Sequence, residues 1–332
     1  MQQIPTFAGI DISKLTLDIC ILDNNVKAYY KIDNELQAIK TFFERWALQY
    51  PMLYIGMENT GCYNYPLYQA LNELAVPYYV IPPIHLKKSL GLSRGKNDKI
   101  DSLRIAQFLQ TNCRNLQVYK PQRAVVTQLR LLLNLRELRI KMKKQLMGNG
   151  EQYAYFPAET TAPLMEADNQ YIALIDEQVK NLETQIQTLI SNDAKLALCF
   201  KLISSVQGVG KILGWNLLVK TGEFDTITDP RKLACFAGVV PFDYSSGSSI
   251  RGRSKVSHYA DKSLKKLLHL AAMSAIRLNG DLKDYYQRKV TEGKNKMSVL
   301  NAVRNKIIHR VYAVLKNQQP YQIYRPDSLV MS

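Results

Sequence analysis

The sequence contains few cysteines, and none are arranged to build a disulfide framework or a zinc site. Five cysteines occur among 332 residues, an odd number, widely spaced and without a Cys-x-x-Cys pair, which fits a reducing compartment. The N-terminus lacks a charged segment followed by an apolar one, so we expect no signal peptide. No apolar run approaches the roughly 20 residues that a membrane span requires. We therefore expect a soluble, cytoplasmic protein.

Acidic residues are also scarce: 28 Asp and Glu stand against 44 Lys and Arg, giving a formal net charge of +16. The excess lies in two zones, because residues 85–147 hold 15 basic and 3 acidic residues and residues 251–316 hold 16 and 4. The segments 1–84 and 148–250 are mildly acidic. A basic surface can serve solubility alone, but two blocks this dense favour a nucleic-acid partner.

The chain is long enough for two domains, and its first hundred residues alternate between apolar runs and amphipathic segments. We predict strands at residues 7–11, 17–22, 26–32, 53–57 and 78–81. Helices are predicted at residues 35–50, 65–74 and 98–110. Three strands, then helix, strand, helix, strand and helix is the order of an α/β RNase H-like (RuvC-like) domain, which we assign to residues 1–121.

Four carboxylates fall where such a sheet would gather metal ions. Asp11 ends the first predicted strand and Glu58 follows the fourth, its neighbour in this layout; Asp98 and Asp101 share a face at the start of a helix that can pack across both. Two Mg²⁺ ions require several carboxylates close together. Each acid alone could be a helix cap, a turn residue or a surface acid. Their convergence would indicate a metal centre that binds two Mg²⁺ ions.

Residues 122–200 are predicted to form a coiled-coil arm with a connecting loop. Its two long helices are expected over 122–147 and 168–191, joined by a loop at Gly148–Ala167. The first helix repeats apolar residues at heptad-like spacing, at Leu131, Leu135, Leu138 and Met142. The second does so at Ile172, Ile175, Val179, Leu182, Ile186 and Leu189. An antiparallel arm, a dimerisation coil, or two helices packed on a domain fit this pattern equally well.

The first of these helices also carries a basic face that we expect to contact RNA or DNA. Its members are Arg136, Arg139, Lys141, Lys143 and Lys144. Because such contacts replace counterions on the phosphates, binding should weaken steeply with salt.

A mainly α-helical domain is expected over residues 201–318, followed by a tail at 319–332. Helices are predicted at 230–236, 261–278 and 297–316. The segment Ile203–Gly210 resembles a helix–hairpin–helix turn, in which glycines let backbone N–H groups approach a phosphate, although any tight turn between helices has a similar pattern.

Between these helices, the segment Tyr244–Lys255 combines serines and glycines with basic residues. Such a stretch is most often a flexible, solvated loop. Beside Arg251 and Arg253, however, a serine hydroxyl could attack a phosphodiester while the cations stabilise the developing charge. His258 could act as a base, contact a phosphate or be structural, and the other histidines form no ligand cluster.

Several motifs, in order along nearly the whole chain, resemble those of the DEDD-type transposases of bacterial insertion sequences. The N-terminal ones are Gly9–Lys14, Met57–Gly61 and Lys96–Asp101. The C-terminal ones are Val206–Gly210, Phe236–Pro241 and the Ser-Gly element before Arg251.

This resemblance implies a RuvC-like domain, a coiled-coil arm and a C-terminal transposase domain that carries a nucleophilic serine. By position, Asp11, Glu58, Asp98 and Asp101 become the catalytic, metal-binding tetrad, and the nucleophile becomes Ser246, with Ser245 as the fallback. The resemblance further implies a noncoding bridge RNA that pairs with donor and target double-stranded DNA. It also implies a homo-tetramer built from dimers, with each active site shared between protomers.

These inferences converge on a Mg²⁺-dependent, RNA-guided DNA recombinase that moves its own insertion sequence through a phosphoserine intermediate. The main alternative is a RuvC-like Holliday-junction nuclease that uses the same acids to activate water. A non-catalytic binding protein descended from a transposase is a third possibility, but we would expect it to have lost one of the four acids.

Overall fold

The structure, a computed structural model, describes residues 5–24, 26–89, 97–240, 242–246, 250–255 and 260–322, with backbone alone at 88–89, 242–246 and 250–255. The chain divides into two compact units, residues 1–121 and 122–332. Within the described ranges no helix has the length and apolarity to cross a membrane.

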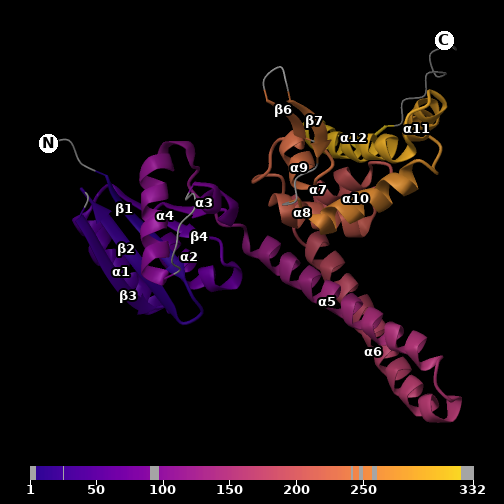
Figure 1. Ribbon diagram of the computed structural model, residues 1–332, viewed down its shortest axis with the longest axis horizontal. Helices are drawn as coiled ribbons and strands as arrows, with labels where there is room; N and C mark the ends of the chain where they lie inside the picture. Colours follow the sequence, from indigo (N-terminus) through magenta and orange to yellow (C-terminus); the bar gives the residue numbers. More distant parts are fainter. Residues whose placement is uncertain are drawn as a thin grey trace. The chain divides into compact units, whose positions relative to one another are not determined.

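The first unit is built on a five-stranded sheet (Figure 1). Strands β1 (Thr6–Ile12), β2 (Thr16–Asp23) and β3 (Val26–Asp33) form an antiparallel meander. Strands β4 (Leu53–Glu58) and β5 (Tyr78–Ile81) lie parallel to β1, giving the order β3-β2-β1-β4-β5. The structure thereby confirms the RNase H-like fold predicted from the sequence.

Alternation along the strands separates the two faces of this sheet. Ala8, Ile10 and Ile12 are buried on one face, in a core shared with helices α1 (Leu36–Gln49) and α2 (Tyr65–Glu73). The opposite face packs against helix α4 (Asp98–Asn112), whose Ala106 and Leu109 bury Phe7 and Leu22. The odd-numbered residues of β1, including Asp11, therefore belong to the α4 face.

Two glycines allow α4 to approach the sheet. Gly9 of β1 and Gly56 of β4 are cross-strand partners on this face. A Cβ atom on Gly9 would lie 2.1 Å from the Ser102 carbonyl oxygen and 2.3 Å from the Ala106 nitrogen, both backbone atoms. Any side chain at Gly9 would therefore displace α4, whose N-terminus carries Asp98 and Asp101.

Three short helices of this unit were not predicted. They are η1 (Gly61–Asn64), α3 (Pro83–Ser89) and η2 (Cys113–Asn115). Each spans at most two turns, which is too short for hydrophobic periodicity to reveal.

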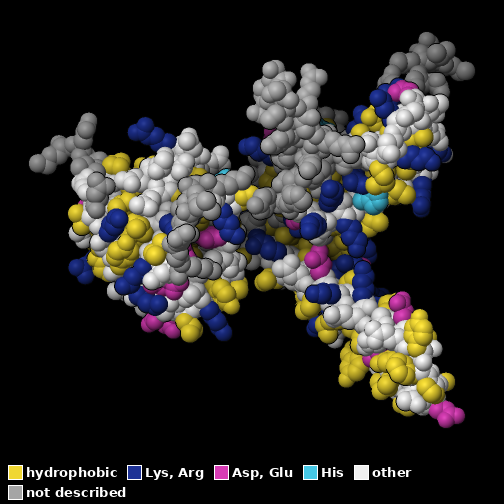
Figure 2. Space-filling view, in the orientation of Figure 1, with side chains coloured by type: hydrophobic (Ala, Val, Ile, Leu, Met, Phe, Trp, Pro, Cys, Tyr) yellow, Lys and Arg dark blue, Asp and Glu magenta, His cyan; other side chains and the backbone are white. Residues whose placement is uncertain are grey.

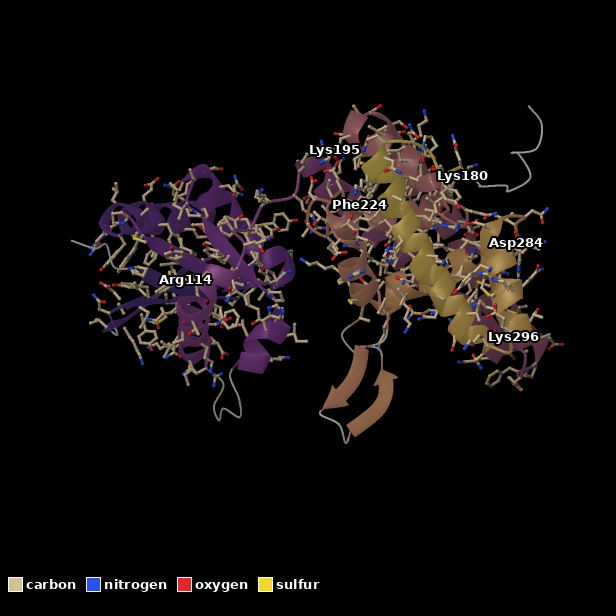
Figure 3. The ribbon with its side chains drawn as sticks, turned by 90° about the horizontal axis from the view of Figure 1, so that it is seen from above. Arg114, Lys180, Lys195, Phe224, Asp284 and Lys296 are labelled. Carbon is tan, nitrogen blue, oxygen red and sulfur yellow. The ribbon has the colours of Figure 1, made fainter. Side chains whose placement is uncertain are left out.

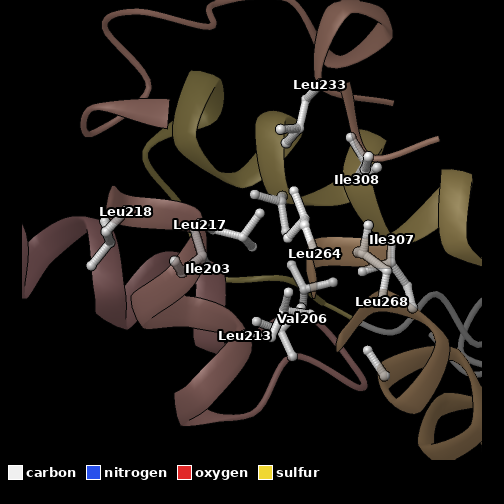
Figure 4. Packing of buried hydrophobic residues seen from close by; sticks show 14 of the residues in the cluster. Ile203, Val206, Leu213, Leu217, Leu218, Leu233, Leu264, Leu268, Ile307 and Ile308 are labelled. Carbon is white, nitrogen blue, oxygen red and sulfur yellow. The ribbon is translucent and has the colours of Figure 1, made fainter. Parts of the chain in front are cut away.

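The second unit combines a helical domain with a long helical arm (Figure 1). Its helices are α5 (Ala124–Tyr153), α6 (Ala158–Ser191), α7 (Ala194–Ser204), α8 (Lys211–Thr221), α9 (Pro230–Phe236), α10 (Lys262–Ala275), α11 (Asp281–Thr291) and α12 (Lys296–Asn317). Strands β6 (Phe242–Ser246) and β7 (Ile250–Lys255) form an antiparallel hairpin. Figure 4 shows the core, where residues such as Leu213, Leu217, Leu264 and Ile307 interlock.

Helices α5 and α6 run antiparallel and pack along their length, so they form the arm. The prediction of a loop at Gly148–Ala167 is wrong, because α5 continues to Tyr153 and α6 already begins at Ala158 with Pro163 inside it. Gly148 has no atom within 4 Å of the position where its Cβ would lie. The helix-breaking tendency of these residues is overridden by the continuous packing of the two helices.

The heptad pattern predicted the inner seam of α6 correctly but that of α5 wrongly. In α6, Ile175, Leu182 and Ile186 are buried as expected. In α5 the buried residues are Val126, Leu129 and Leu133. The predicted seam is exposed, at Leu131, Leu135, Leu138 and Met142. Periodicity identifies an apolar face of a helix but not which neighbour covers it.

The basic face predicted for nucleic-acid contact is partly used within the arm. Arg136 pairs with Glu183 at 2.7 Å, and Lys143 pairs with Asp176 at 2.6 Å. Arg139 donates to the Gln178 side chain at 2.6 Å. Three of its five members therefore bind α6, which leaves Lys141 and Lys144 as its exposed part.

An ion-pair cluster fixes the base of the arm. Arg123, directly before α5, donates to both carboxylate oxygens of Asp193 at 2.8 and 2.9 Å, and its Nε donates to Glu223 at 2.8 Å. Glu223 is buried. The Arg123 hydrogen bond is the main reason that the pKa of Asp193 falls to about 2. The start of α5 is thus held against the N-terminus of α7.

Replacing Gly9 by alanine should destabilise the first unit by about 3 kcal/mol, the upper range for overpacking, because the new methyl group meets backbone atoms of α4. Gly148→Ala is the control: with open space around it, that substitution should stabilise the protein by about 0.5–1 kcal/mol. Urea denaturation measures both. Equal stability of Gly9→Ala and wild type would show that α4 does not need this contact.

Candidate active site

The four predicted acids come from three elements that meet at one end of the sheet. Asp11 lies near the end of β1 and Glu58 at the end of β4, its parallel neighbour. Asp98 and Asp101 lie in the first turn of α4, which packs on β1, β2 and β4. The fold therefore brings together the elements that the sequence predicted to converge.

Electrostatic coupling links all four side chains. The pKa of Asp11 rises from 3.8 to about 6, firstly because the carboxyl is partly buried, and then because of the negative charges of Asp101, Asp98 and Glu58. The raised pKa therefore reflects a partly buried carboxyl with further acidic side chains nearby.

A fifth acid, Asp18, belongs to this cluster and was missed in the sequence. Asp18 lies directly opposite Asp11 in the β1–β2 register, is buried, and adds to the rise in the pKa of Asp11. Its own charge is offset by Lys31 of β3, 3.3 Å away. One feature of the sequence could have indicated Asp18: it is a charged residue within the otherwise apolar run Leu17–Leu22. A position at the sheet edge or facing solvent explains such a residue equally well.

The loop after β4 is fixed by Asn64, another residue that sequence reasoning missed. Asn64 is fully buried, and its side chain donates to the Glu58 carbonyl at 2.9 Å. Its amide oxygen accepts from the Thr60 backbone N–H at 2.8 Å and from the Thr60 hydroxyl. These bonds hold the backbone that presents Glu58.

The N-terminus of α4 is capped, which sets where its two acids lie. The Asn97 side chain accepts from the Lys99 amide at 3.1 Å. Asp101 accepts from Arg104 at 2.8 Å within the same helix. The positive end of the helix dipole stabilises both carboxylates.

The four carboxylates are ligands that suit a divalent cation, but their side chains are not arranged around a common point. Carboxylate oxygens are the ligands that Mg²⁺ prefers, and the like-charge repulsion at Asp11 is what a bound cation would relieve. Among the described residues, however, no three His, Cys, Asp or Glu side chains are arranged to hold a metal ion.

The predicted nucleophile lies in the second unit, on the β6–β7 hairpin. The structure places Ser246 at the end of β6, with Ser245 opposite Arg251 and Ser246 opposite Ile250 in the backbone register. Their side chains, like Ser248, Ser249 and His258, lie outside the described residues. The serine-rich stretch is thus largely a hairpin rather than a plain loop, and it stands out from the helices in Figure 3.

The helices on either side of this hairpin, α9 and α10, are joined by a hydrogen bond. The Asp261 amide donates to the Phe236 carbonyl at 2.8 Å, joining the end of α9 to the start of α10. The Asp261 side chain caps α10 through the Leu264 amide at 2.8 Å and pairs with Lys220 at 2.6 Å. The hydrogen bond from Asp261 to Phe236 thus joins the helix that precedes the hairpin to the start of the helix that follows it.

The predicted glycine turn also exists as a tight connection between two helices, α7 and α8. Gly208 has a φ of +91°, and a Cβ there would lie 2.4 Å from the Ala271 carbonyl oxygen. Its close packing on α10 accounts for the glycine without a ligand. A phosphate contact at this turn stays a prediction.

Comparison with known proteins identifies the protein family of this chain. Residues 8–149 match a DEDD transposase family model, and residues 200–287 match the model of the transposase IS116/IS110/IS902 family. The chain belongs to the IS110/IS116 family of transposases. It is therefore a DNA transposase/recombinase enzyme, and the first model spans all four acids while the second spans the serine hairpin.

Two curated relatives match nearly the full length of this transposase. The pilin gene-inverting protein of Moraxella lacunata is 25% identical over 95% of this chain and 97% of its own. The transposase for insertion sequence element IS1111A of Coxiella burnetii is 22% identical over 95% of this chain and 90% of its own. Among solved structures, Thermus thermophilus RuvC in complex with a Holliday junction substrate is 12% identical with a TM-score of 0.29, covering 35% of this chain and all of that one.

The raised pKa of Asp11 predicts how Asp11→Asn changes stability without metal. Between about pH 4 and pH 6 the folded wild-type protein holds a proton that the unfolded chain has released, so its stability falls as the pH rises through this window. Above pH 6 the charged Asp11 destabilises the fold, and asparagine removes that penalty. Asp11→Asn should therefore raise the melting temperature in EDTA, with a gain that grows from pH 4 to pH 6 and then levels off.

The matched control is Asp33→Asn, an exposed aspartate at the end of β3. Asp33→Asn removes an aspartate outside the acid cluster, so it should not reproduce the gain expected for Asp11→Asn. Thermal denaturation followed by circular dichroism measures both variants, and a pH-independent gain for Asp11→Asn would contradict the electrostatic account of the cluster.

Proposed function

We propose that this transposase is a bridge-RNA-guided DNA recombinase that moves its own insertion sequence. In this proposal it cleaves and rejoins donor and target DNA through a phosphoserine intermediate with Mg²⁺ assistance. The observation that carries the proposal is the convergence of Asp11, Glu58, Asp98 and Asp101 in a protein of this family, with Ser246 on a separate hairpin.

Asp11, Glu58, Asp98 and Asp101 would hold the metal, for which two Mg²⁺ ions are expected. When bound, the ions would supply Lewis-acid stabilisation of negative charge on the phosphate. Arg104 and the capped start of α4 orient Asp101, while Asn64 orients the backbone at Glu58.

Ser246 would act as the nucleophile, with Ser245 as the alternative. Its hydroxyl oxygen forms a bond to phosphorus as the bond from phosphorus to one deoxyribose oxygen breaks. The serine proton passes to a base, and the leaving oxygen takes up a proton to become a free hydroxyl. Reversal of these steps on another strand rejoins DNA without an external energy source, because the phosphodiester energy is kept in the serine ester.

The names of the relatives support strand exchange rather than simple hydrolysis. One is a pilin gene-inverting protein and another is an insertion-sequence transposase. Both inversion and transposition require that broken strands be rejoined to new partners. A reaction that conserves the phosphodiester energy serves both.

The partners in this proposal are bridge RNA, donor and target double-stranded DNA, and further copies of the chain, as a tetramer. Two dense basic zones, 85–147 and 251–316, support binding of two nucleic acids. A cytoplasmic location would give access to them.

The competing function is a RuvC-like Holliday-junction nuclease. The same acids could activate water, and the product would then be a free phosphate and hydroxyl. A non-catalytic binding protein is disfavoured because all four acids are present.

Ser246→Ala should abolish strand cleavage while leaving assembly with RNA and DNA intact, because only one hydroxyl is lost. Ser245→Ala, one residue away in the same strand, is the matched control and should keep most of the activity. The assay is a denaturing gel of the protein with labelled donor and target DNA, bridge RNA and Mg²⁺, read for a protease-sensitive protein–DNA adduct. Asp11→Ala, Glu58→Ala, Asp98→Ala and Asp101→Ala should each lose the adduct.

Three outcomes would change the proposal. An adduct that survives in Ser246→Ala and vanishes in Ser245→Ala moves the nucleophile by one residue. Cleaved DNA with no adduct in wild type favours the hydrolytic nuclease. Normal recombination without RNA removes the guide from the mechanism.

A further inference from the structure

Strands β1 and β4 stop pairing just before their acidic residues. Their parallel register ends at Ile10 and Met57, so Asp11 and Glu58 lie one residue beyond the last shared pair. From there Asp11 continues to pair with β2, and Glu58 with β5, on opposite sides. The ladder of backbone hydrogen bonds between β1 and β4 therefore does not fix the gap between these two acids.

Charge alone would not hold the two acid-bearing strand ends together. The negative charges of Asp11 and Glu58 repel each other. Figure 2 shows acidic side chains with basic ones near them on the visible face of the first unit, so a general excess of one sign does not organise this surface. A specific bond between the two loops is needed to oppose the repulsion.

One buried asparagine supplies that bond. Asn34 directly follows β3, and its side-chain nitrogen donates to the Ser13 carbonyl and to the Tyr63 carbonyl, each at 3.0 Å. Ser13 comes two residues after Asp11. Tyr63 lies in η1, on the loop that follows Glu58. Both hydrogens of one amide group therefore hold the two loops that follow the acid-bearing strands.

Asn34 is itself held firmly. It is only 9% exposed, and its backbone N–H donates to the Leu15 carbonyl at 2.8 Å. The turn that it contacts is closed by the Ser13 hydroxyl, which donates to the Thr16 carbonyl at 2.8 Å and accepts from the Thr16 amide at 3.1 Å. The bridge thus starts from a fixed position and ends on an ordered turn.

Each end of the bridge lies close to an acid along the chain. At one end, the neighbouring Asn64 donates to the Glu58 carbonyl at 2.9 Å. At the other end, a single residue separates Ser13 from Asp11. Displacement of Asn34 would therefore reach both acids through short stretches of backbone.

The two bonds use the amide nitrogen of Asn34 and not its oxygen. Its Oδ1 is buried and has no hydrogen-bond partner in the described part of the chain. Because an unpaired buried acceptor opposes folding, stability alone does not explain an asparagine at this position. Neither an ionised aspartate nor an apolar side chain could donate to the two carbonyls.

We propose that Asn34 is a positioning residue for the acid cluster: it holds the loop after β1 to the loop after β4 and so sets the separation of Asp11 and Glu58. The acids then bind a divalent cation more tightly than they would on unconnected loops, because their repulsion is opposed before the cation arrives. This inference rests on the proposed function for one point, the binding of metal by these acids.

The test measures Mn²⁺ binding by the full chain without nucleic acid, using calorimetric titration and the electron paramagnetic resonance signal of free Mn²⁺. Asn34→Leu keeps the branched shape of the side chain and removes both donors. It should raise the Mn²⁺ dissociation constant about tenfold or more, as expected for a residue that supports metal ligands. Asn34→Ala removes the same donors without added bulk and should act alike. Asp11→Ala gives the baseline for cation binding elsewhere on the chain.

The matched control is Asn112→Leu, at the other end of α4 from the acids. The side-chain nitrogen of Asn112 donates to the Phe108 carbonyl at 2.9 Å, so this substitution removes the same kind of bond within the same unit. It should lower the stability to urea and leave the Mn²⁺ dissociation constant unchanged. Loss of stability is thereby measured separately from loss of positioning.

Unchanged Mn²⁺ affinity in Asn34→Leu and Asn34→Ala would overturn the proposal, as would an equal loss of affinity in Asn112→Leu. A wild type that binds no Mn²⁺ above the Asp11→Ala baseline would overturn this proposal together with the proposed metal site. If Mn²⁺ binds and the Asn34 variants weaken it, but wild type forms no DNA adduct, the serine chemistry fails and the role of Asn34 stands.

Discussion

The backbone of α4 lies directly on strand β1, and the acid cluster depends on that contact. Only a residue without a side chain permits it, because the position of a Cβ on Gly9 is already occupied by backbone atoms of Ser102 and Ala106. Two residues further along β1, on the same face, comes Asp11. The first turn of α4 brings Asp98 and Asp101 to that end of the sheet. The glycine thus sets the distance between carboxylates that belong to different elements.

Holding acids together in this way opposes folding unless a cation is present. Burial and four neighbouring charges raise the pKa of Asp11, while Lys31 offsets Asp18 and Arg104 pairs with Asp101. The fold tolerates the remaining repulsion because the surrounding strands and α4 are anchored by apolar cores on both faces of the sheet. Repulsion between like charges is typical of a site that is arranged for binding rather than for stability.

Sequence patterns predicted the sheet, and the elements that carry the four acids, because each strand is a short apolar run with clear turn residues at its ends. Glu58 and Asp11 could be placed because their strands are parallel neighbours in this fold. Asp18 could not, since a charged residue within a strand is equally compatible with a solvent-facing position, and only the β1–β2 register places it opposite Asp11. In the arm, Leu131 and Leu135 looked like an inner seam because they repeat as one, whereas the neighbour that covers a helix face is decided by three-dimensional packing.

The helical extent of the arm was underestimated for a related reason. Gly148 and Pro163 weaken a helix locally, but two long helices that pack side by side recover the loss through many contacts. The serine hairpin was treated as a loop because glycine and serine dominate its composition. Its pairing depends on a register that composition does not contain.

The ion-pair cluster at Arg123 also fixes where the second unit begins. On one side, the Tyr119 amide is bonded to the Tyr78 carbonyl of β5 at 2.8 Å, so the chain is attached to the sheet up to that residue. On the other side, Arg123 is attached to Asp193 and Glu223. Only Lys120, Pro121 and Gln122 remain between them, and the φ of proline is fixed. The boundary between the two units is thus set by bonded residues on both sides, Tyr119 in the first unit and Arg123 in the second.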